Sequence, residues 1–270
     1  MKKRLVLLLT LIVACSLIFC CCSNNVDDNR NRRVNSVCHR GYGDAPENTL
    51  AAFRTAKAQG FDAVECDVRF TKDGVAVLLH DKTVNRTSNG RGRISDMTYD
   101  EVRKLDFGSW KSSEYANTRI PTFSEFVGLC VELNLHPYIE IKNGATAEQV
   151  RYLVDVIENA SIEATWIARK IEYLSQVSQF RTDDRLGLIA DVISGINVKA
   201  LVRLDAGRNV CFMDANYSFL TSPQISLCKK YCLPLEVWTL DNVGVIRNID
   251  PYISGVTSNF LNAEKIFSEL

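Results

Sequence analysis

Two acidic residues stand two positions apart in the segment AVECDVRF, residues 63–70. The apolar positions between them predict a β-strand, so Glu65 and Asp67 point to the same face with Cα atoms about 6–7 Å apart. Two carboxylates on one face of a core strand repel each other and lose hydration unless a cation or a proton lies between them. A solvated face is the simpler alternative; a buried face indicates a cation site.

A second pair of charged residues lies in the segment PYIEIKN, residues 137–143. Glu140 and Lys142 share one face of the predicted strand, whereas Ile139 and Ile141 share the other. An internal salt bridge would by itself explain the charged pair. If this strand lies beside residues 63–70, three carboxylates converge, and an all-oxygen set suits one divalent cation, Mg²⁺ or Ca²⁺, better than zinc. Arg40 and Lys142 would offset the remaining negative charge and attract a phosphate.

The chain has three histidines, and two of them end apolar strand patterns. His39 and His80 are therefore expected at the same rim as the carboxylates, where histidine can take and give protons near neutral pH. Cleavage of a phosphodiester needs both events. His136 instead begins its strand, so we predict a structural role for it at the opposite face of the fold.

The elements that must position these residues alternate along the chain as short apolar strands and amphipathic helices. This order over about 235 residues is typical of an α/β fold, a (β/α)8 TIM barrel. A doubly wound open sheet is the alternative. The predicted strands are Val34–His39, Ala63–Arg69, Pro137–Lys142, Thr165–Ala168, Leu186–Ala190, Val210–Asp214, Leu235–Leu240 and Ser254–Thr257.

One segment interrupts this rhythm. After a further apolar run, Val75–His80, the residues from about 81 to 120 contain a Gly-rich turn and only a short helical pattern. Such a segment is too long for a simple connection between a strand and a helix. We expect a small insertion subdomain after the second strand that covers the site, with a purely structural excursion as the alternative.

The N-terminus differs from the rest of the chain. Residues 1–22 combine a basic start with an uncharged apolar stretch, and Ile12-Val13-Ala14-Cys15 resembles a bacterial lipobox. Residues 23–33 are polar, as suits a tether, and the barrel is expected over 34–270. We therefore expect an exported lipoprotein that is membrane-tethered through its N-terminus only and faces the periplasm or exterior. An uncleaved anchor and a cleaved signal peptide are the alternatives.

Charge and cysteine content limit the other partners. Lys+Arg and Asp+Glu are equal at 32 each, which gives no reason to expect binding to nucleic acid. Six cysteines follow the N-terminal segment, and most lie in apolar strand or helix patterns. A chain of this length needs no disulfides to fold, so we expect buried free thiols.

Taken together, the motifs resemble those of the glycerophosphodiester phosphodiesterases. The resemblance covers nearly all of residues 34–270 and keeps the family's order. It also includes the insertion, whose segments 94–98 and 105–110 are similar to those of the family. The motifs are His39-Arg40-Gly41, Pro46-Glu47-Asn48-Thr49, Glu65-x-Asp67, Leu79-His80-Asp81, Arg86-Thr87, Glu140-x-Lys142 and Val237-Trp238-Thr239.

The resemblance implies a (β/α)8 barrel that hydrolyses a small-molecule glycerophosphodiester to sn-glycerol 3-phosphate and an alcohol. A phospholipase D-like hydrolase of intact lipids and a non-catalytic glycerophosphodiester-binding lipoprotein are the alternatives. The implied roles are catalysis by His39 and His80, metal binding by Glu65, Asp67 and Glu140, phosphate binding by Arg40 and Lys142, and an apolar wall for glycerol formed by Trp238.

One position departs from the family's pattern. Family members usually carry an acidic residue after the last strand, whereas this chain has Asn259 in the segment TSNFL. The change removes a charge near the rim. We expect it to affect substrate preference more than catalysis.

Overall fold

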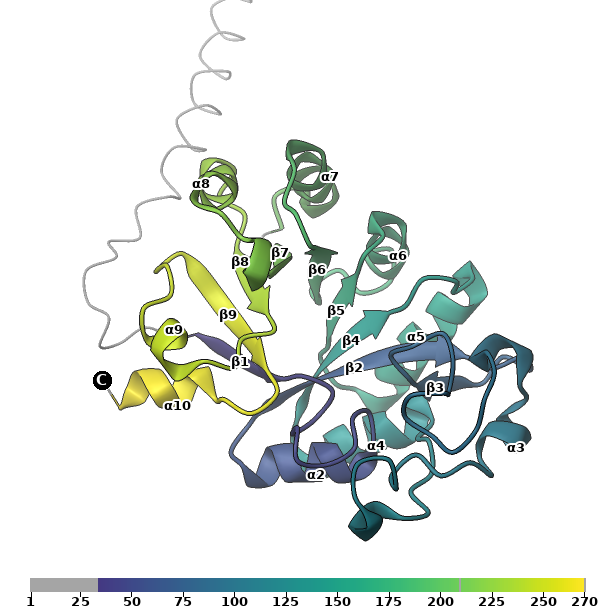
Figure 1. Ribbon diagram of the computed structural model, residues 1–270. Helices are drawn as coiled ribbons and strands as arrows, with labels where there is room; N and C mark the ends of the chain where they lie inside the picture. Colours follow the sequence, from purple (N-terminus) through teal and green to yellow (C-terminus); the bar gives the residue numbers. More distant parts are fainter. Residues whose placement is uncertain (1–33, 209, 270) are drawn as a thin grey trace, which may run out of the picture.

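The computed structural model describes residues 34–208 and 210–269, which form a closed barrel of parallel strands with one antiparallel addition (Figure 1). The hydrogen-bonded order is β1-β9-β8-β7-β6-β5-β4-β2-β3, and a β1–β2 pairing closes the ring. The (β/α)8 prediction is therefore confirmed, and each predicted barrel strand is present. The strands are β1 (Asn35–Cys38), β2 (Ala63–Phe70), β3 (Ala76–Leu78), β4 (His136–Ile141), β5 (Thr165–Ala168), β6 (Arg185–Ala190), β7 (Cys211–Asn216), β8 (Leu235–Trp238) and β9 (Ile253–Ser258).

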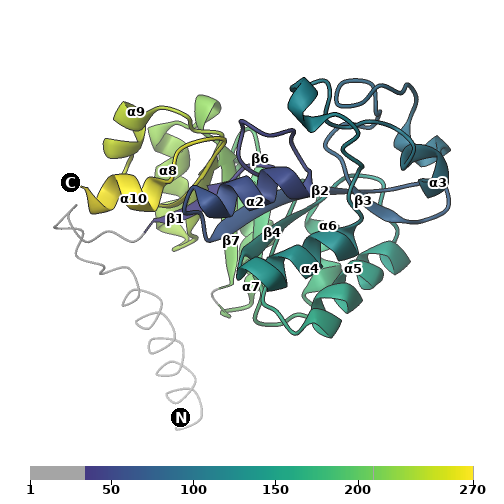
Figure 2. The ribbon, with the colours of Figure 1, turned by 90° about the horizontal axis from the view of Figure 1, so that it is seen from below.

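Helices surround the strands on the outside of the barrel (Figures 1 and 2). Several begin where the side chain of a threonine or serine accepts a hydrogen bond from the third helical residue, which satisfies an otherwise unpaired N–H. Thr122 with Glu125 and Thr146 with Gln149 are such capping boxes. The helices are α2 (Leu50–Ala58), α3 (Tyr99–Val102), α4 (Phe123–Leu133), α5 (Ala147–Ala160), α6 (Ile171–Val177), α7 (Gly195–Asp205), α8 (Ser222–Lys230), α9 (Val243–Arg247) and α10 (Ala263–Ser268).

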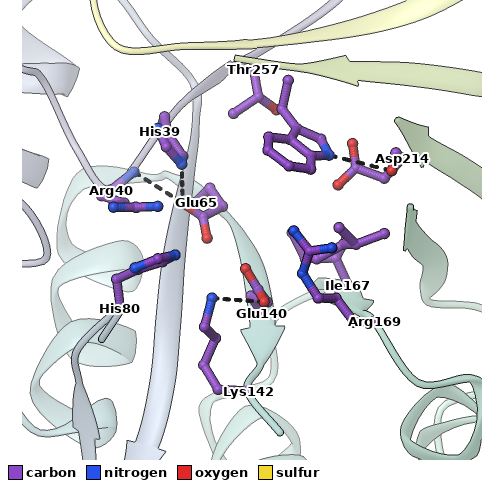
Figure 3. A pocket seen from close by; sticks show the side chains of 12 residues that line it. His39, Arg40, Glu65, His80, Glu140, Lys142, Ile167, Arg169, Asp214 and Thr257 are labelled. Carbon is purple, nitrogen blue, oxygen red and sulfur yellow. Dashed lines mark hydrogen bonds and ion pairs between the residues drawn. The ribbon is translucent and has the colours of Figure 1, made fainter. Parts of the chain in front are cut away.

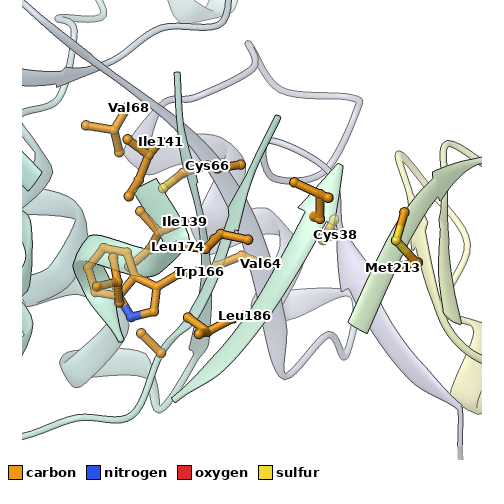
Figure 4. Packing of buried hydrophobic residues seen from close by; sticks show 14 of the residues in the cluster. Cys38, Val64, Cys66, Val68, Ile139, Ile141, Trp166, Leu174, Leu186 and Met213 are labelled. Atoms are coloured by element: carbon orange, nitrogen blue, oxygen red, sulfur yellow. The ribbon is translucent and has the colours of Figure 1, made fainter. Parts of the chain in front are cut away.

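The main hydrophobic core lies between the barrel and its helices (Figure 4). Val64, Cys66 and Val68 of β2 and the isoleucines of β4 point outward into it. Alternate residues of the same strands must then point into the barrel, because strand side chains alternate between faces. The barrel interior has its own apolar layer, formed by Val37, Tyr138, Ile167, Ile189 and Phe212.

Two glycines make room for large side chains inside the barrel. A Cβ at Gly187 would lie 2.4 Å from the ring of Phe212, and one at Gly255 would lie 2.5 Å from the side chain of Glu236. Neither distance is compatible with a real Cβ. Close packing therefore requires glycine at these positions. Gly255 leaves room inside the barrel for the charged side chain of Glu236.

The insertion predicted at about 81–120 follows a hairpin rather than a barrel strand. β3 pairs antiparallel with the end of β2, with Val68 opposite Leu78, and so turns the chain back toward the barrel mouth. The N–H of Leu79 donates to the carbonyl of Asp67. The insertion has a small core of its own, which includes Val84, Ile94 and Phe107. In Figure 2 it extends beyond the barrel beside β2 and β3.

The expectation of free thiols holds for five of the six cysteines. Cys38, Cys66, Cys130, Cys211 and Cys228 are buried and free. The expectation was wrong for the sixth, Cys232, which is disulfide-bonded.

The predicted leader, residues 1–22, and the tether, residues 23–33, lie outside the described residues. Within the described residues, no helix is long and apolar enough to cross a membrane.

Candidate active site

The three predicted carboxylates converge inside the barrel toward the carboxyl ends of β2 and β4. Figure 3 shows two of them, Glu65 and Glu140. The two strands pair in parallel with Asp67 opposite Glu140. One carboxylate oxygen from each of Glu65, Asp67 and Glu140 lies within 4.8 Å of the others. Glu65 is 4% exposed and Asp67 is 1% exposed. The face that carries them is therefore buried, and the alternative of a solvated face is excluded.

The carboxylates shift one another's pKa values, and the shifts favour a further positive charge at this site. Burial and the nearby Asp67 raise the pKa of Glu65 well above its usual range. The same two causes raise the pKa of Glu140. Burial would also raise the pKa of Asp67, but Lys142 and Arg40 hold it well below its usual value. The three groups therefore cannot all be ionised unless another cation joins them.

A divalent cation fits this donor set. The ligand atoms are oxygens, which Mg²⁺ and Ca²⁺ prefer, and Asp67 Oδ1 accepts no hydrogen bond although it is buried. Lys142 Nζ does lie 3.0 Å from that oxygen, as an ion pair. Glu65, Asp67 and Glu140 are the residues that would hold the ion.

Two basic side chains border the carboxylates. Arg40 Nε lies 3.2 Å from Asp67 Oδ2, and its backbone N–H donates to Glu65 Oε2 at 3.0 Å. Lys142 Nζ lies 2.8 Å from Glu140 Oε1. The structure thus brings both predicted phosphate-binding residues to the same cavity. An incoming phosphate would meet two cations at fixed positions.

His39 ends β1 and faces the carboxylates. Its Nε2 lies 4.0 Å from Glu65 Oε2, while Nδ1 is hydrogen-bonded to Asn259 Oδ1 at 2.9 Å. Burial and the adjacent Arg40 lower the pKa of His39 to about 4. The imidazole is therefore neutral at pH 7 in this arrangement and can accept a proton at the nitrogen that faces the cavity.

His80 reaches the cavity from the insertion side, because β3 returns the chain to the mouth. Its Nδ1 is hydrogen-bonded to Asp81 Oδ1 at 2.7 Å. Arg86 donates to Asp81 and also forms a bidentate ion pair with Glu47, at 2.6 and 2.8 Å. Burial lowers the pKa of His80, and Asp67 and Asp81 oppose that shift. The carboxylate partner orients the ring and stabilises its protonated form.

Three residues in the turn after β1 adopt the left-handed backbone conformation, with positive φ values. Arg40 and Asn48 have φ values of 56° and 57°, and Gly41 has a φ of 82° with no room for a Cβ beside Ala52. Asn48 uses both ends of its amide on one partner: Nδ2 donates to Asp67 Oδ2 at 2.7 Å, and Oδ1 accepts from the Asp67 N–H. The turn therefore fixes a metal-site carboxylate as well as Arg40.

The far wall of the cavity is largely apolar. Ile167, Ile189 and Trp238 line it, and Trp238 Nε1 donates to the carbonyl of Asp214. The predicted glycerol-facing tryptophan therefore lies in the same cavity as the charged residues. Burial and Glu236 raise the pKa of Asp214 well above its usual range, which favours the protonated, hydrogen-bond-donating form of this side chain.

The structure brings together the eight predicted site residues and separates His136 from them. His136 begins β4 at the opposite end of the barrel and is hydrogen-bonded to Thr165 Oγ1. Sequence reasoning missed the role of Asp214 and the contact between Asn259 and His39. Both residues follow the alternation of inward-facing positions, but no local pattern indicates which inward positions meet.

Comparisons with known proteins identify the family of this chain. The sequence model of the "Glycerophosphoryl diester phosphodiesterase family" matches residues 39–260. Glycerophosphodiester phosphodiesterase 1 of Mus musculus is 47% identical over 116 residues, which are 42% of this chain and 35% of the relative. Glycerophosphodiester phosphodiesterase of Caldanaerobacter subterraneus is 45% identical over 109 residues, 40% of this chain and 45% of the relative. The matched segments thus span less than half of these relatives.

Solved structures match over more of the chain. A phosphodiesterase of Oleispira antarctica, in complex with the product sn-glycerol-3-phosphate, superposes with a TM-score of 0.78 at 27% identity. The match covers 87% of this chain and 95% of that one. A structure from Silicibacter pomeroyi has a TM-score of 0.74 at 20% identity, over 88% of this chain and 94% of that one, and so supports the fold alone.

Proposed function

This chain belongs to the glycerophosphoryl diester phosphodiesterase family, and from that premise we propose that it hydrolyses glycerophosphodiesters to sn-glycerol 3-phosphate and an alcohol. One observation carries the proposal: two histidines, two basic side chains and three carboxylates converge on one cavity at the carboxyl ends of the barrel strands. This is the end of a (β/α)8 barrel where catalytic residues lie.

Substrate binding follows from the charges around the cavity. Arg40 and Lys142 would bind the phosphate oxygens, and the apolar wall that contains Trp238 would face the glycerol. A bound Mg²⁺ or Ca²⁺ would stabilise negative charge on the phosphoryl oxygens and lower the pKa of a coordinated hydroxyl. We propose one divalent cation, Mg²⁺ or Ca²⁺, because the three oxygen ligands suit both ions.

The two histidines differ in their hydrogen-bond partners, Asn259 for His39 and Asp81 for His80, and this difference supports different roles. His39 is neutral and presents Nε2 to the cavity, so it is the base that takes the proton from the nucleophile, either water or the glycerol 2-hydroxyl. His80 is paired with Asp81, which stabilises its protonated form. It is the acid that gives a proton to the leaving alkoxide as the P–O bond to the alcohol breaks.

A coupled assay for sn-glycerol 3-phosphate tests this proposal. The full-length protein is incubated with glycerophosphodiesters of choline, ethanolamine, glycerol and inositol, with and without a chelator. We expect release of sn-glycerol 3-phosphate from at least one diester, and loss of that release with the chelator. Tight binding without turnover would instead support a binding protein, and activity on intact phospholipid alone would support a phospholipase D-like enzyme.

We also propose that the protein is exported and tethered to a membrane by its N-terminus. The support is sequence alone, namely the basic start, the apolar stretch and the small residue before Cys15. If Cys15 carries a lipid, Cys15→Ser should release the protein from the membrane fraction or leave a larger precursor. Unchanged membrane attachment with unchanged mobility would favour an uncleaved anchor.

A further inference from the structure

Asn259, the position that departs from the family's pattern, contacts a proposed catalytic residue. It follows β9 and its Oδ1 lies 2.9 Å from His39 Nδ1. The backbones are also joined: the N–H of His39 donates to the carbonyl of Ser258, and the N–H of Gly43 donates to the carbonyl of Asn259. The amide is therefore held at a fixed place beside the imidazole. The position expected to affect substrate preference therefore also contacts the proposed catalytic histidine.

Asp241, which follows β8, determines which way this amide faces. Its Oδ1 accepts hydrogen bonds from Ser258 Oγ at 2.6 Å and from the backbone N–H of Asn259 at 2.7 Å. Its Oδ2 faces the side-chain nitrogen of Asn259. Because three donors surround the carboxylate, it can act only as an acceptor. Asn259 must therefore turn Nδ2 toward Asp241 and Oδ1 toward His39; the reverse orientation would place two oxygens in contact.

The orientation of the amide decides the tautomer of His39. A carbonyl oxygen accepts and cannot donate, so the hydrogen bond at His39 Nδ1 requires a proton on that nitrogen. In the neutral ring, the lone pair is then on Nε2, the nitrogen that faces Glu65 and the cavity. We propose that Asn259, oriented by Asp241, is a positioning residue that holds His39 as the Nδ1–H tautomer so that Nε2 acts as the base. This inference rests on the proposed hydrolysis only for its effect on turnover.

An amide also differs from the acidic residue usual at this place in the family. It supplies the same acceptor without adding a negative charge next to Glu65 and Asp67. It also cannot take the proton from Nδ1. The negative charge that orients the amide is on Asp241, which contacts Asn259. It acts on His39 only through that amide.

Asp241→Asn is the variant that tests the relay. The oxygen of the new amide should keep the hydrogen bond from the backbone N–H of Asn259, because an N–H group can only donate. Its NH₂ group then faces Asn259, whose amide must turn around and present Nδ2 to His39. His39 would be forced into the Nε2–H tautomer. We expect kcat/KM to fall by about 10²–10⁴-fold, because the base would carry its proton on the wrong nitrogen.

The double variant Asp241→Asn, Asn259→Asp should reverse this loss. The carboxylate at position 259 accepts from the new amide and from His39 Nδ1, so the original tautomer returns. We expect kcat/KM within about 10-fold of the wild type. A purely structural role for Asp241 predicts no rescue, since the second change would be a further lesion.

Nitrogen NMR of ¹⁵N-histidine-labelled, full-length protein reads the tautomer without substrate. The chain has only three histidines, so His39 is assigned by comparison with the His80→Ala and His136→Gln variants. We expect protonated Nδ1 in the wild type, protonated Nε2 in Asp241→Asn and protonated Nδ1 in the double variant. Switching of the tautomer in a protein that releases no sn-glycerol 3-phosphate would support the relay and contradict the proposed function.

Asp184→Asn is a matched control. Asp184 is a buried carboxylate that accepts hydrogen bonds from Trp166 Nε1 and Arg181 and does not contact the cavity. The variant should lose stability while keeping the His39 tautomer and the kcat/KM of the folded protein. Wild-type tautomer and activity in Asp241→Asn, or a folded double variant that stays inactive, would overturn the inference.

Discussion

The barrel interior contains two clusters of charged residues, and they differ in how well their charges are balanced. The upper cluster, at the carboxyl ends of the strands, contains Glu65, Asp67 and Glu140. The lower cluster, at the opposite end, contains Arg185 and Glu236. In the lower cluster, Arg185 Nη2 lies 2.7 Å from Glu236 Oε1, and Asn35 donates to the same oxygen. Arg185 also donates to the Tyr138 hydroxyl and lies over the ring of Phe212. The positive charge of Arg185 therefore meets the negative charge of Glu236 directly.

The upper cluster does not balance in this way. Three carboxylates share the mouth with two basic side chains, Arg40 and Lys142, so one negative charge is left without a partner. The pKa of Glu65 is raised, by burial and by Asp67, so that without a cation the group holds a proton. Buried charges that satisfy each other stabilise a fold only weakly, whereas an unbalanced set predicts a ligand. Both clusters contain buried charges, but only the cluster at the mouth has more carboxylates than cations. An excess of buried charge of one sign, rather than burial itself, therefore indicates the functional site.

The apolar layer of the interior separates the two clusters. It contains Ile167, Ile189 and Phe212, whose side chains are buried. We therefore expect each cluster to be altered without large effects on the other. The predictions that follow test this independence.

Removal of the metal should have the largest effect. Without a divalent cation the upper cluster cannot hold its carboxylates ionised, so exhaustive chelation should abolish hydrolysis, and Mg²⁺ or Ca²⁺ should restore it. Metal should also raise the unfolding temperature, because it binds only the folded state. Glu140→Gln should raise the metal concentration needed for half-maximal activity, whereas Glu236→Gln in the lower cluster should not. Full activity with no metal detected by elemental analysis would contradict the metal mechanism.

Substitution of the mouth histidines should come next. His39→Ala and His80→Ala should each lower kcat by about 10²–10⁴-fold, the usual contribution of a positioned acid or base. His136→Gln at the other end should keep kcat near the wild-type value when rates are normalised to folded protein by circular dichroism. An inactive His136→Gln with an active His80→Ala would show that the two ends of the barrel were assigned wrongly.

Glu236→Gln should affect stability much more than turnover, although loss of its charge reduces the rise in the pKa of Asp214. It leaves the guanidinium of Arg185 without its ionic partner, which should lower the free energy of unfolding by about 2–3 kcal/mol. This is below the roughly 3–5 kcal/mol for fully buried pairs, because the Arg185 side chain is 33% exposed. Urea unfolding measures the change. Glu172→Gln, on the surface of α6, is the control and should shift stability by no more than about 0.5 kcal/mol. A loss of kcat in folded Glu236→Gln would argue against independent clusters.

The smallest expected effect is a pH dependence of stability from His136. Burial and the nearby Arg185 lower the pKa of this histidine in the folded state. The unfolded chain then binds more protons below about pH 6.5, so stability falls as the pH drops through that range. Thermal unfolding between pH 7.5 and 5.5 should show a smaller loss for His136→Gln than for the wild type. Equal slopes for the two proteins would remove His136 from this role.

Much of the upper cluster could be predicted from the sequence because it follows from local rules. The two-residue period of a strand places Glu65 and Asp67 on one face, and the same rule places Glu140 with Lys142. The order of the elements predicts the barrel, and parallel strands all end at the same rim. These features depend only on neighbours along the chain, so no contact between distant segments needs to be known.

Other features were decided only by the tertiary structure. The sequence predicted His80 at the rim, but only the structure shows that it arrives there because β3 pairs antiparallel with β2. Cys232, in a pattern that resembled the other cysteines, is disulfide-bonded.

The two ends of the barrel are the clearest case. Arg185 meets Glu236 across 51 residues of sequence, and His39 meets Asn259 across 220. The two-residue alternation of a strand shows that such residues point into the barrel. It does not show which of them lie at the same height along the barrel axis. That is determined by the stagger of hydrogen-bonded strands around the closed ring, which is a property of all the strands together. The sequence by itself therefore determined which side chains are available for chemistry, and the closed ring decided which of them meet.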